Sequence, residues 1–120
     1  MKFVLLVRSP PKAGAGTPLS FARAALDQGH EVIQVFFQGD GAHHANRLAA
    51  PPPAEGDFVA DWSAFARSSG AELVLCSTAG LRRGVREANL APGFRISGVG
   101  QWLDAAARAD RVIVFGGRDA

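Results

Sequence analysis

The chain has 120 residues, of which 48% are hydrophobic and 20% are charged, and its formal net charge is +2. This length and balance predict one folded domain spanning residues 1–120 and exclude an intrinsically disordered chain. The basic residues are scattered, so direct nucleic-acid binding is not indicated, and no apolar run approaches the roughly 20 residues that cross a membrane.

Strand and helix signals alternate from the start of the chain. Residues 2–7 are a continuous apolar run that stops at Ser9-Pro10-Pro11, which predicts a strand buried on both faces rather than a signal peptide. Thr17, followed by a proline, predicts the N-cap of a helix that ends near Gln28. Residues 31–37 are rich in β-branched and aromatic side chains and predict a second strand.

A long connection between residues 38 and 57 follows the second strand. Its three prolines, Pro51 to Pro53, leave room for a short helical piece at about residues 44–48. Asp57 is a plausible cap for a second helix, and this helix ends at Ser68-Ser69-Gly70.

The last half of the chain continues the alternation. Residues 72–75 predict a third strand, and Cys76 follows its last apolar residue. Ser97 is the expected cap of a helix over about residues 98–109, and residues 111–115 predict a final strand. The side chains of this helix that we expect to point inward are Val99, Trp102, Leu103 and Ala106.

Alternating strands and helices indicate βαβ units with right-handed crossovers. The expected fold class is therefore α/β, a three-layer αβα arrangement with a mainly parallel central sheet, as in flavodoxin-like and Rossmann-like folds. Reactive sites in such sheets gather at the carboxyl ends of the strands. Cys76 falls at one of these ends.

Cys76 is the only cysteine, so neither an intrachain disulfide nor a structural zinc site can be built from it alone. A thiol becomes reactive when it is partly exposed and its thiolate lies near positive charge or a helix N-terminus. A helix over residues 77–83 would direct free backbone N–H groups toward the sulfur. Whether the side chains of Arg82 and Arg83 also reach the sulfur is left open by the sequence. The alternative is a cysteine that acts only as a small buried hydrophobe.

An intrachain redox cycle requires a second cysteine in a C-x-x-C arrangement, and that residue is absent. The chemistry that remains for a single thiol is sulfur transfer between proteins, in which Cys76 accepts and then donates a sulfur atom. No metal or organic cofactor is needed for this chemistry, and the absence of disulfides favours a cytoplasmic location.

Residues 75–85, LCSTAGLRRGV, form the most distinctive segment of the chain. Further distinctive segments are GHEV at 29–32, Asn46 with Leu48, Asp61-Trp62, NLAPGF at 89–94 and SGVG at 97–100. Together these segments resemble the TusD/DsrE family of sulfur-relay proteins, and residues 75–85 are similar to the cysteine loop of that family. The resemblance covers nearly the whole chain and is closest to TusD.

This resemblance implies a DsrE-like fold in which Cys76 carries a persulfide. It implies a cytoplasmic heterohexamer with TusB-like and TusC-like subunits, a TusA-like sulfur donor, a TusE-like acceptor, and 2-thiouridine at the tRNA wobble position as the destination. Sulfur trafficking in dissimilatory sulfur oxidation stays open as an alternative. A second alternative is a non-catalytic subunit of the same complex, in which Cys76 is buried.

Other residue patterns are compatible with different functions. Gly14-x-Gly16 after the first strand suggests a phosphate-binding turn and a flavodoxin-like nucleotide binder, although a plain turn is favoured because no P-loop ending follows. His43 and His44 are adjacent and form a poor metal pair, so solvent-facing loop histidines are expected. His30, at the start of the second strand, is expected to pack or cap rather than act as a base.

Overall fold

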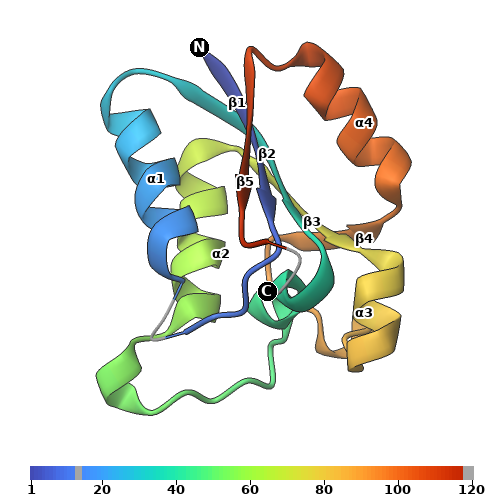
Figure 1. Ribbon diagram of the computed structural model, residues 1–120. Helices are drawn as coiled ribbons and strands as arrows, with labels where there is room; N and C mark the ends of the chain where they lie inside the picture. The colour runs from blue at the N-terminus through green and yellow to red at the C-terminus, as the bar shows by residue number, and fades with distance from the viewer. Residues whose placement is uncertain (13–14, 118–120) are drawn as a thin grey trace.

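The computed structural model describes residues 1–12 and 15–117. These residues form a five-stranded sheet in the order β4-β3-β2-β1-β5, and every pair of neighbouring strands is parallel (Figure 1). The strands are β1 (Lys2–Val7), β2 (Glu31–Phe37), β3 (Glu72–Cys76), β4 (Phe94–Ser97) and β5 (Arg111–Phe115).

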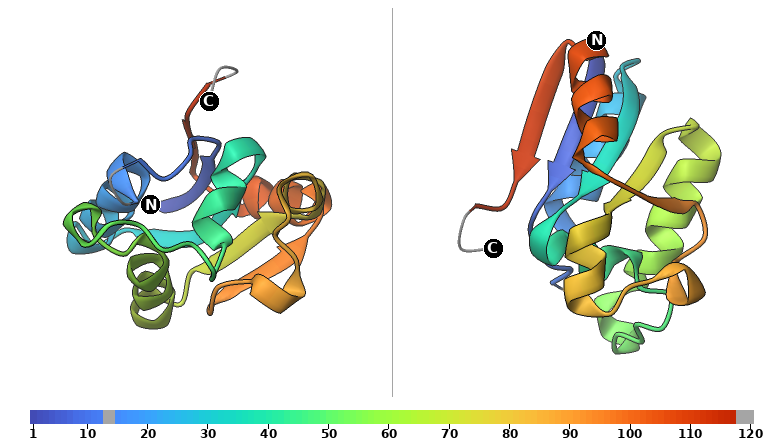
Figure 2. Two further views of the ribbon diagram at one scale, coloured as in Figure 1. Left: turned by 90° about the horizontal axis from the view of Figure 1, so that it is seen from below. Right: turned by 90° about the vertical axis from the view of Figure 1, so that its right-hand side faces the viewer.

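Helices cover both faces of this sheet. The helices are α1 (Gly16–Asp27), α2 (Phe58–Ser69), α3 (Ser77–Arg83) and α4 (Val99–Arg108), with 3-10 turns η1 (Gly39–Ala45), η2 (Pro53–Glu55) and η3 (Glu87–Asn89). Helices α1 and α2 lie on one face and α4 on the other, while α3 and η1 sit at the carboxyl end of the strands (Figure 2). The predicted three-layer α/β class is confirmed.

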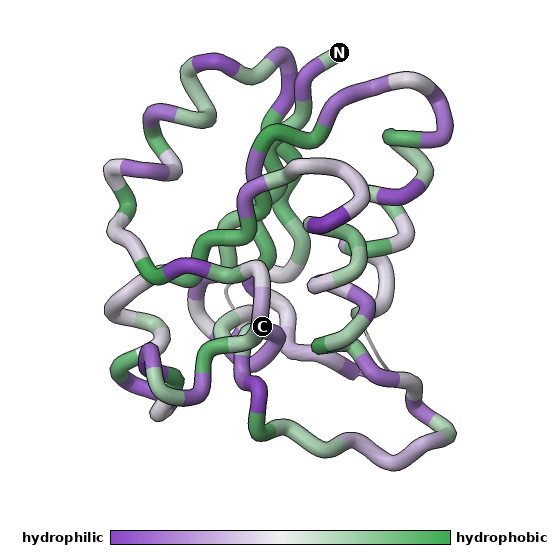
Figure 3. The backbone as a smooth tube through the Cα atoms, turned by 180° about the vertical axis from the view of Figure 1, so that it is seen from behind, coloured by the Kyte–Doolittle hydropathy of each residue, from purple (hydrophilic) through white to green (hydrophobic). Residues whose placement is uncertain are grey.

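The core lies between the sheet and the α1–α2 layer. Phe3 of β1 packs edge-on against Phe21 of α1 with ring centroids 5.5 Å apart, and Phe37 of β2 packs edge-on against Trp62 of α2 at 5.1 Å. Hydrophobic residues are concentrated in the central strands, as the colouring of the backbone shows (Figure 3). Buried parallel strands require this composition because helices cover both of their faces.

Asp57 caps α2 as predicted, because its carboxylate accepts a hydrogen bond from the backbone N–H of Ala60 at 3.1 Å. Gly70 ends the helix in the left-handed conformation with a φ of 75°. The predicted Thr17 cap of α1 is wrong: the helix begins at Gly16, its N-cap residue is Ala15, and no side chain caps it.

The edge strand β4 is absent from the sequence-based prediction. It has four residues, and it joins β3 through a register that pairs Leu73 with Phe94 and Cys76 with Ser97. Ser97 therefore ends a strand instead of capping a helix, and the N-cap of α4 is Gly98, which has no side chain that could accept a hydrogen bond from the first N–H groups of the helix. A strand this short has too few alternating positions to produce a clear pattern.

Two further predictions need correction. The helical piece expected at residues 44–48 lies earlier in the chain, at η1. Gly41 of η1 approaches β1 so closely that an added Cβ would lie 2.0 Å from the carbonyl oxygen of Val7. Val99 and Leu103 of α4 do not point inward: they are 45% and 55% exposed, and Ala105 is the buried residue of this helix.

No helix among residues 1–12 and 15–117 has both the length and the apolar character needed to cross a lipid bilayer.

Candidate functional site

Cys76 occupies the junction between β3 and α3. It is the last residue of β3, it lies in register with Ser97 of β4, and it is the N-cap residue of α3. The helix over residues 77–83 that the sequence suggests does form. The thiol therefore lies at the carboxyl edge of a parallel sheet, where α/β proteins place reactive groups.

Cys76 is buried in this chain rather than partly exposed. Its relative exposure is 6%, and it belongs to the main hydrophobic cluster together with Leu75 and Ala79. A reagent or a partner thiol has little access to a cysteine in such a position. Any chemistry at Cys76 thus requires that neighbouring segments move or that a partner uncovers the residue.

Arg82 and Arg83 are not brought close to the start of α3. Both lie in its last turn, at the end opposite to Cys76. Their positive charges interact favourably there with the negative, C-terminal end of the helix dipole. Arg83 is held there, because its Nε donates to the Asp40 carboxylate at 3.1 Å and its Nη1 donates to the Ala79 carbonyl at 3.2 Å. Arg82 is exposed.

The Arg83–Asp40 ion pair joins α3 to η1 beside the carboxyl ends of the strands. Close packing accompanies it: a Cβ added to Gly80 would lie 2.7 Å from the carbonyl oxygen of Val85. Asn89 adds a second connection, since its side-chain amide donates to the Gly84 carbonyl and to the Asn46 side chain, both at 3.1 Å. Sequence reasoning assigned neither Asp40 nor Asn89 a contact here, because an ion pair or an amide hydrogen bond between residues 43 positions apart leaves no local signal.

His44 is not a solvent-facing loop residue, which contradicts the prediction. It is 1% exposed, its Nδ1 accepts a hydrogen bond from the indole N–H of Trp62 at 3.0 Å, and its Nε2 donates to the carbonyl of Ser9 at 3.0 Å. Burial lowers the pKa of His44 to about 4. The imidazole is therefore neutral at physiological pH and joins η1 to α2 and to the segment after β1.

His43 is exposed, as expected, and His30 packs against the ring of Phe3 at 5.5 Å, which confirms a packing role. No cluster of three or more metal-binding side chains occurs among the residues that the structure describes.

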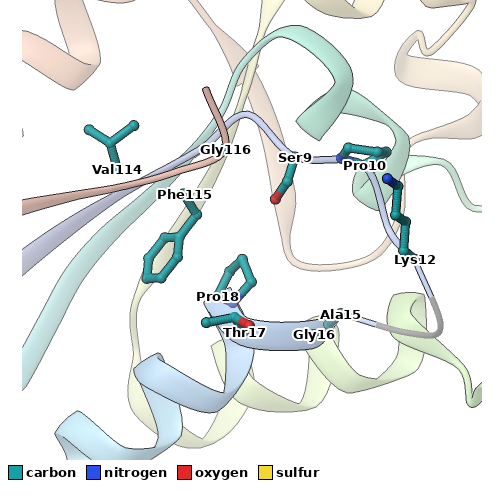
Figure 4. Close-up of a pocket in the computed structure, with 10 residues that line it drawn as sticks. All are labelled: Ser9, Pro10, Lys12, Ala15, Gly16, Thr17, Pro18, Val114, Phe115 and Gly116. Atoms are coloured by element: carbon teal, nitrogen blue, oxygen red, sulfur yellow. The ribbon is translucent and has the colours of Figure 1, made fainter. Parts of the chain in front are cut away.

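Gly16, the second glycine of the Gly14-x-Gly16 pattern, lines a cavity of about 460 Å³ at the carboxyl ends of β1 and β5. The segment after β1 forms one wall and the start of α1 the opposite wall, with Lys12 and Thr17 among the lining residues (Figure 4). Gly14 itself lies outside the described residues. In the sheet order, β2 and β1 separate β3 from β5, so this cavity is distinct from the surroundings of Cys76.

Comparison with known proteins gives consistent matches along the whole chain. Sulfurtransferase TusD of Sodalis glossinidius is 41% identical over 96% of this chain and 98% of its own length. Sulfurtransferase TusD of an Enterobacter strain is 38% identical over 96% of this chain, and DsrE of Allochromatium vinosum is 37% identical over 97%.

Two solved structures share the fold at low sequence identity. The ychN protein of E. coli superimposes with a TM-score of 0.74 at 18% identity, covering 96% of this chain and 100% of its own. A protein of unknown function from Methanobacterium thermoautotrophicum gives a TM-score of 0.76 at 15% identity, covering 95% of this chain and 98% of its own. The model of the DsrE/DsrF-like family matches residues 1–115. With near-complete coverage by both the family model and its relatives, this chain belongs to the DsrE/DsrF-like family.

Proposed function

We propose that this protein is a sulfurtransferase subunit that holds a sulfur atom as a persulfide on Cys76 and passes it to a partner protein. The observation that carries the proposal is the place of Cys76, the last residue of β3 at the carboxyl edge of the sheet, in a chain whose relatives are named sulfurtransferases. The chain has no other thiol that could take this role.

The reaction consists of two thiol exchanges. The thiolate of Cys76 attacks the outer sulfur of a donor persulfide, a new S–S bond forms at Cys76, and the donor leaves as a thiolate when its own S–S bond breaks. The acceptor thiolate then attacks the outer sulfur on Cys76 and releases the Cys76 thiolate. No net electron change occurs, so neither an oxidant nor a reductant is consumed.

The burial of Cys76 makes access a central requirement of this mechanism. The seven-residue helix α3 begins directly after the cysteine and is flanked by Gly84, which has a φ of 74°. At its far end, α3 is joined to η1 by the Arg83–Asp40 ion pair and to η3 by the hydrogen bond from Asn89 to the Gly84 carbonyl. A shift of this short helix, induced by a partner, would expose Cys76 without disturbing the central strands.

Assembly with related subunits is part of the proposal. We define the α4–β5 surface as Val99 and Leu103 of α4 with Val112 and Val114 of β5, four large apolar side chains that are all exposed. Exposed apolar groups in adjacent elements are typical of protein interfaces. TusB-like and TusC-like subunits are the proposed occupants of a cytoplasmic heterohexamer, with a TusA-like donor, a TusE-like acceptor and tRNA wobble 2-thiouridine as the destination.

The deciding experiment is intact-mass spectrometry after incubation with a cysteine desulfurase, cysteine and a TusA-like donor, in the presence of the partner subunits. A gain of one sulfur atom that is lost on reduction is expected for the native protein, and the Cys76→Ser variant should gain none. The same gain in the variant, or no gain in the native protein, would contradict the proposal.

A second function is favoured by the 6% exposure of Cys76. In this alternative the chain is a non-catalytic subunit that only shapes an interface of the complex. Thiol labelling separates the two: modification of Cys76 in the assembled native complex supports the carrier, whereas modification only after denaturation supports the structural subunit.

A further inference from the structure

Helix α3, which begins directly after Cys76, has few apolar contacts to anchor it. Its two buried residues are Ala79 and Gly80, and its one large apolar side chain, Leu81, is 57% exposed. Helix α2, by comparison, buries three aromatic side chains, those of Phe58, Trp62 and Phe65. A helix of seven residues also gains little from its own backbone hydrogen bonds. The position of α3 therefore depends to a large extent on its polar contacts.

Arg83 makes the polar contacts that join α3 to η1. Its Nε donates to the Asp40 carboxylate at 3.1 Å, and its Nη1 donates at 3.2 Å to the carbonyl of Ala79, the third residue after Cys76. One guanidinium group thus connects η1 to the turn of α3 that follows the cysteine. The side chains of Arg83 and Asp40 are 24% and 39% exposed, so water and salt reach this ion pair. A partly exposed ion pair contributes modestly to stability and can open reversibly.

The η1 side of this contact is fixed. His44 of η1 is buried, and both of its ring nitrogens are hydrogen-bonded, one to the indole of Trp62 and the other to the carbonyl of Ser9. Gly41 lies against the carbonyl oxygen of Val7, where an added Cβ would be only 2.0 Å away. When the ion pair opens, we therefore expect η1 to stay in place and α3 to move.

We infer that Asp40 is a positioning residue for the sulfur site, because through Arg83 it holds α3 in the arrangement that buries Cys76. Opening of the Asp40–Arg83 ion pair releases the far end of α3, and the helix then shifts about its junction with β3 and exposes the thiol. The inference rests on the proposed function, since access to Cys76 matters for sulfur transfer only if Cys76 carries the sulfur. It adds the contact that sets how often the thiol is exposed.

Alkylation of Cys76 in the native full-length protein measures this opening. Iodoacetamide is the probe, because it is uncharged and its approach does not depend on the charges that the variants remove. The alkylation rate of the native chain, divided by that of the urea-unfolded chain, gives the fraction of time for which the thiol is exposed. We expect Asp40→Ala to raise the native rate by about fivefold, equivalent to about 1 kcal/mol. Asp40→Glu, which retains the charge, should raise it much less.

Glu72→Ala is the matched control. Glu72 begins β3, the strand that ends at Cys76, and it forms a comparable ion pair with Arg95 at 2.6 Å. Removing this carboxylate leaves the contact between α3 and η1 intact. The alkylation rate of Glu72→Ala should therefore equal that of the native protein.

Arg83→Ala tests whether Asp40 acts through Arg83. If the two residues act through one contact, adding Asp40→Ala to the Arg83→Ala variant should not raise the alkylation rate further. Salt gives a second readout of the same contact. A concentration of 1 M should raise the rate of the native protein, because it screens the ion pair, but not the rate of Asp40→Ala.

The dependence of the alkylation rate on urea separates a shift of α3 from unfolding of the whole chain. A local shift exposes little surface, so the rate should change little at low urea concentrations. Alkylation through global unfolding would instead rise with the full denaturation slope. A full slope in the native protein would overturn the inference, and so would equal rates for Asp40→Ala and Glu72→Ala or a further increase in the double variant.

Intact-mass measurement of sulfur gain tests the proposed function separately. A protein that gains sulfur on Cys76, but whose alkylation rate is unchanged by Asp40→Ala, refutes only the positioning role of Asp40. A protein whose variants expose Cys76 as expected, but which gains no sulfur, refutes only the persulfide.

Discussion

The two faces of the sheet differ in how completely the helices bury them. On the face covered by α1 and α2, Trp62 is fully buried and its indole N–H is paired with His44. On the face covered by α4, Trp102 packs on Phe36 at 6.5 Å but remains half-buried, and its indole nitrogen has no partner among the described residues.

The strand order explains this difference. Val112 and Val114 of the edge strand β5 are in register with Val4 and Leu6 of β1. Residues in register on parallel strands point to the same face, and Leu6 is also in register with Phe36, which contacts α4. Both valines therefore point to the α4 face. A single helix of ten residues covers this face and leaves β5 open.

Burial within the chain is more complete on the α1–α2 face than on the α4 face. We therefore expect the α1–α2 face to supply most of the stability of the isolated chain and the α4–β5 surface to be available for other proteins.

The largest effect is expected from removing the buried tryptophan. Trp62→Ala should lower the free energy of unfolding by about 3–5 kcal/mol, because it creates a cavity and leaves His44 without its hydrogen-bond donor. Trp102→Ala should cost clearly less, because Trp102 is only half-buried. Urea denaturation of both variants measures the difference, and equal losses would contradict the division between the two faces.

Acid should weaken the α1–α2 face through His44. The pKa of His44 is about 4 in the folded chain and 6.5 as the reference value, so the unfolded chain binds a proton more readily. Stability is then fully present above pH 6.5 and decreases as the pH falls toward 4, by at most roughly 3 kcal/mol.

Denaturation midpoints between pH 7 and pH 4 measure this loss. The His44→Gln variant is the control, and it should lose less stability over the same pH range than the native protein. An unchanged pH dependence in this variant would show that other groups cause the acid sensitivity.

Polar contacts on the α4 face should contribute little. Arg95 of β4 donates to the Glu72 carboxylate at 2.6 Å and to the Gln101 side chain of α4 at 2.9 Å, and all of these groups are exposed. Arg95→Ala is expected to cost less than about 1 kcal/mol, because solvent screens exposed ion pairs. The cost should shrink in 1 M salt, and a cost of several kcal/mol would mean that this network is a major anchor of α4.

The smallest effect on stability is expected on the α4–β5 surface. Leu103→Lys should change the free energy of unfolding by less than about 0.5 kcal/mol, because Leu103 is exposed in the isolated chain. The same change should reduce assembly with partner subunits, measured by size-exclusion chromatography with light scattering. Normal assembly of this variant would exclude Leu103 from the interface.

Local sequence patterns predicted the elements with strong signals. The strands at residues 2–7, 31–37 and 111–115 lie where the apolar runs place them, and Asp57 caps α2 as expected. The patterns failed at β4, a strand of four residues that is defined by its pairing with β3. They also failed for Val99 and Leu103, because helical spacing shows which residues share a face but not whether anything covers that face.

Local composition and motifs of neighbouring residues are enough to indicate the α/β class, the family and the position of Cys76 at the end of a buried strand. The packing of the helices buries Cys76, pairs Arg83 with Asp40 instead of directing it to the thiol, and makes His44 a neutral core residue. These features depend on contacts between segments far apart in the chain, and such contacts are set by how the helices pack around the sheet.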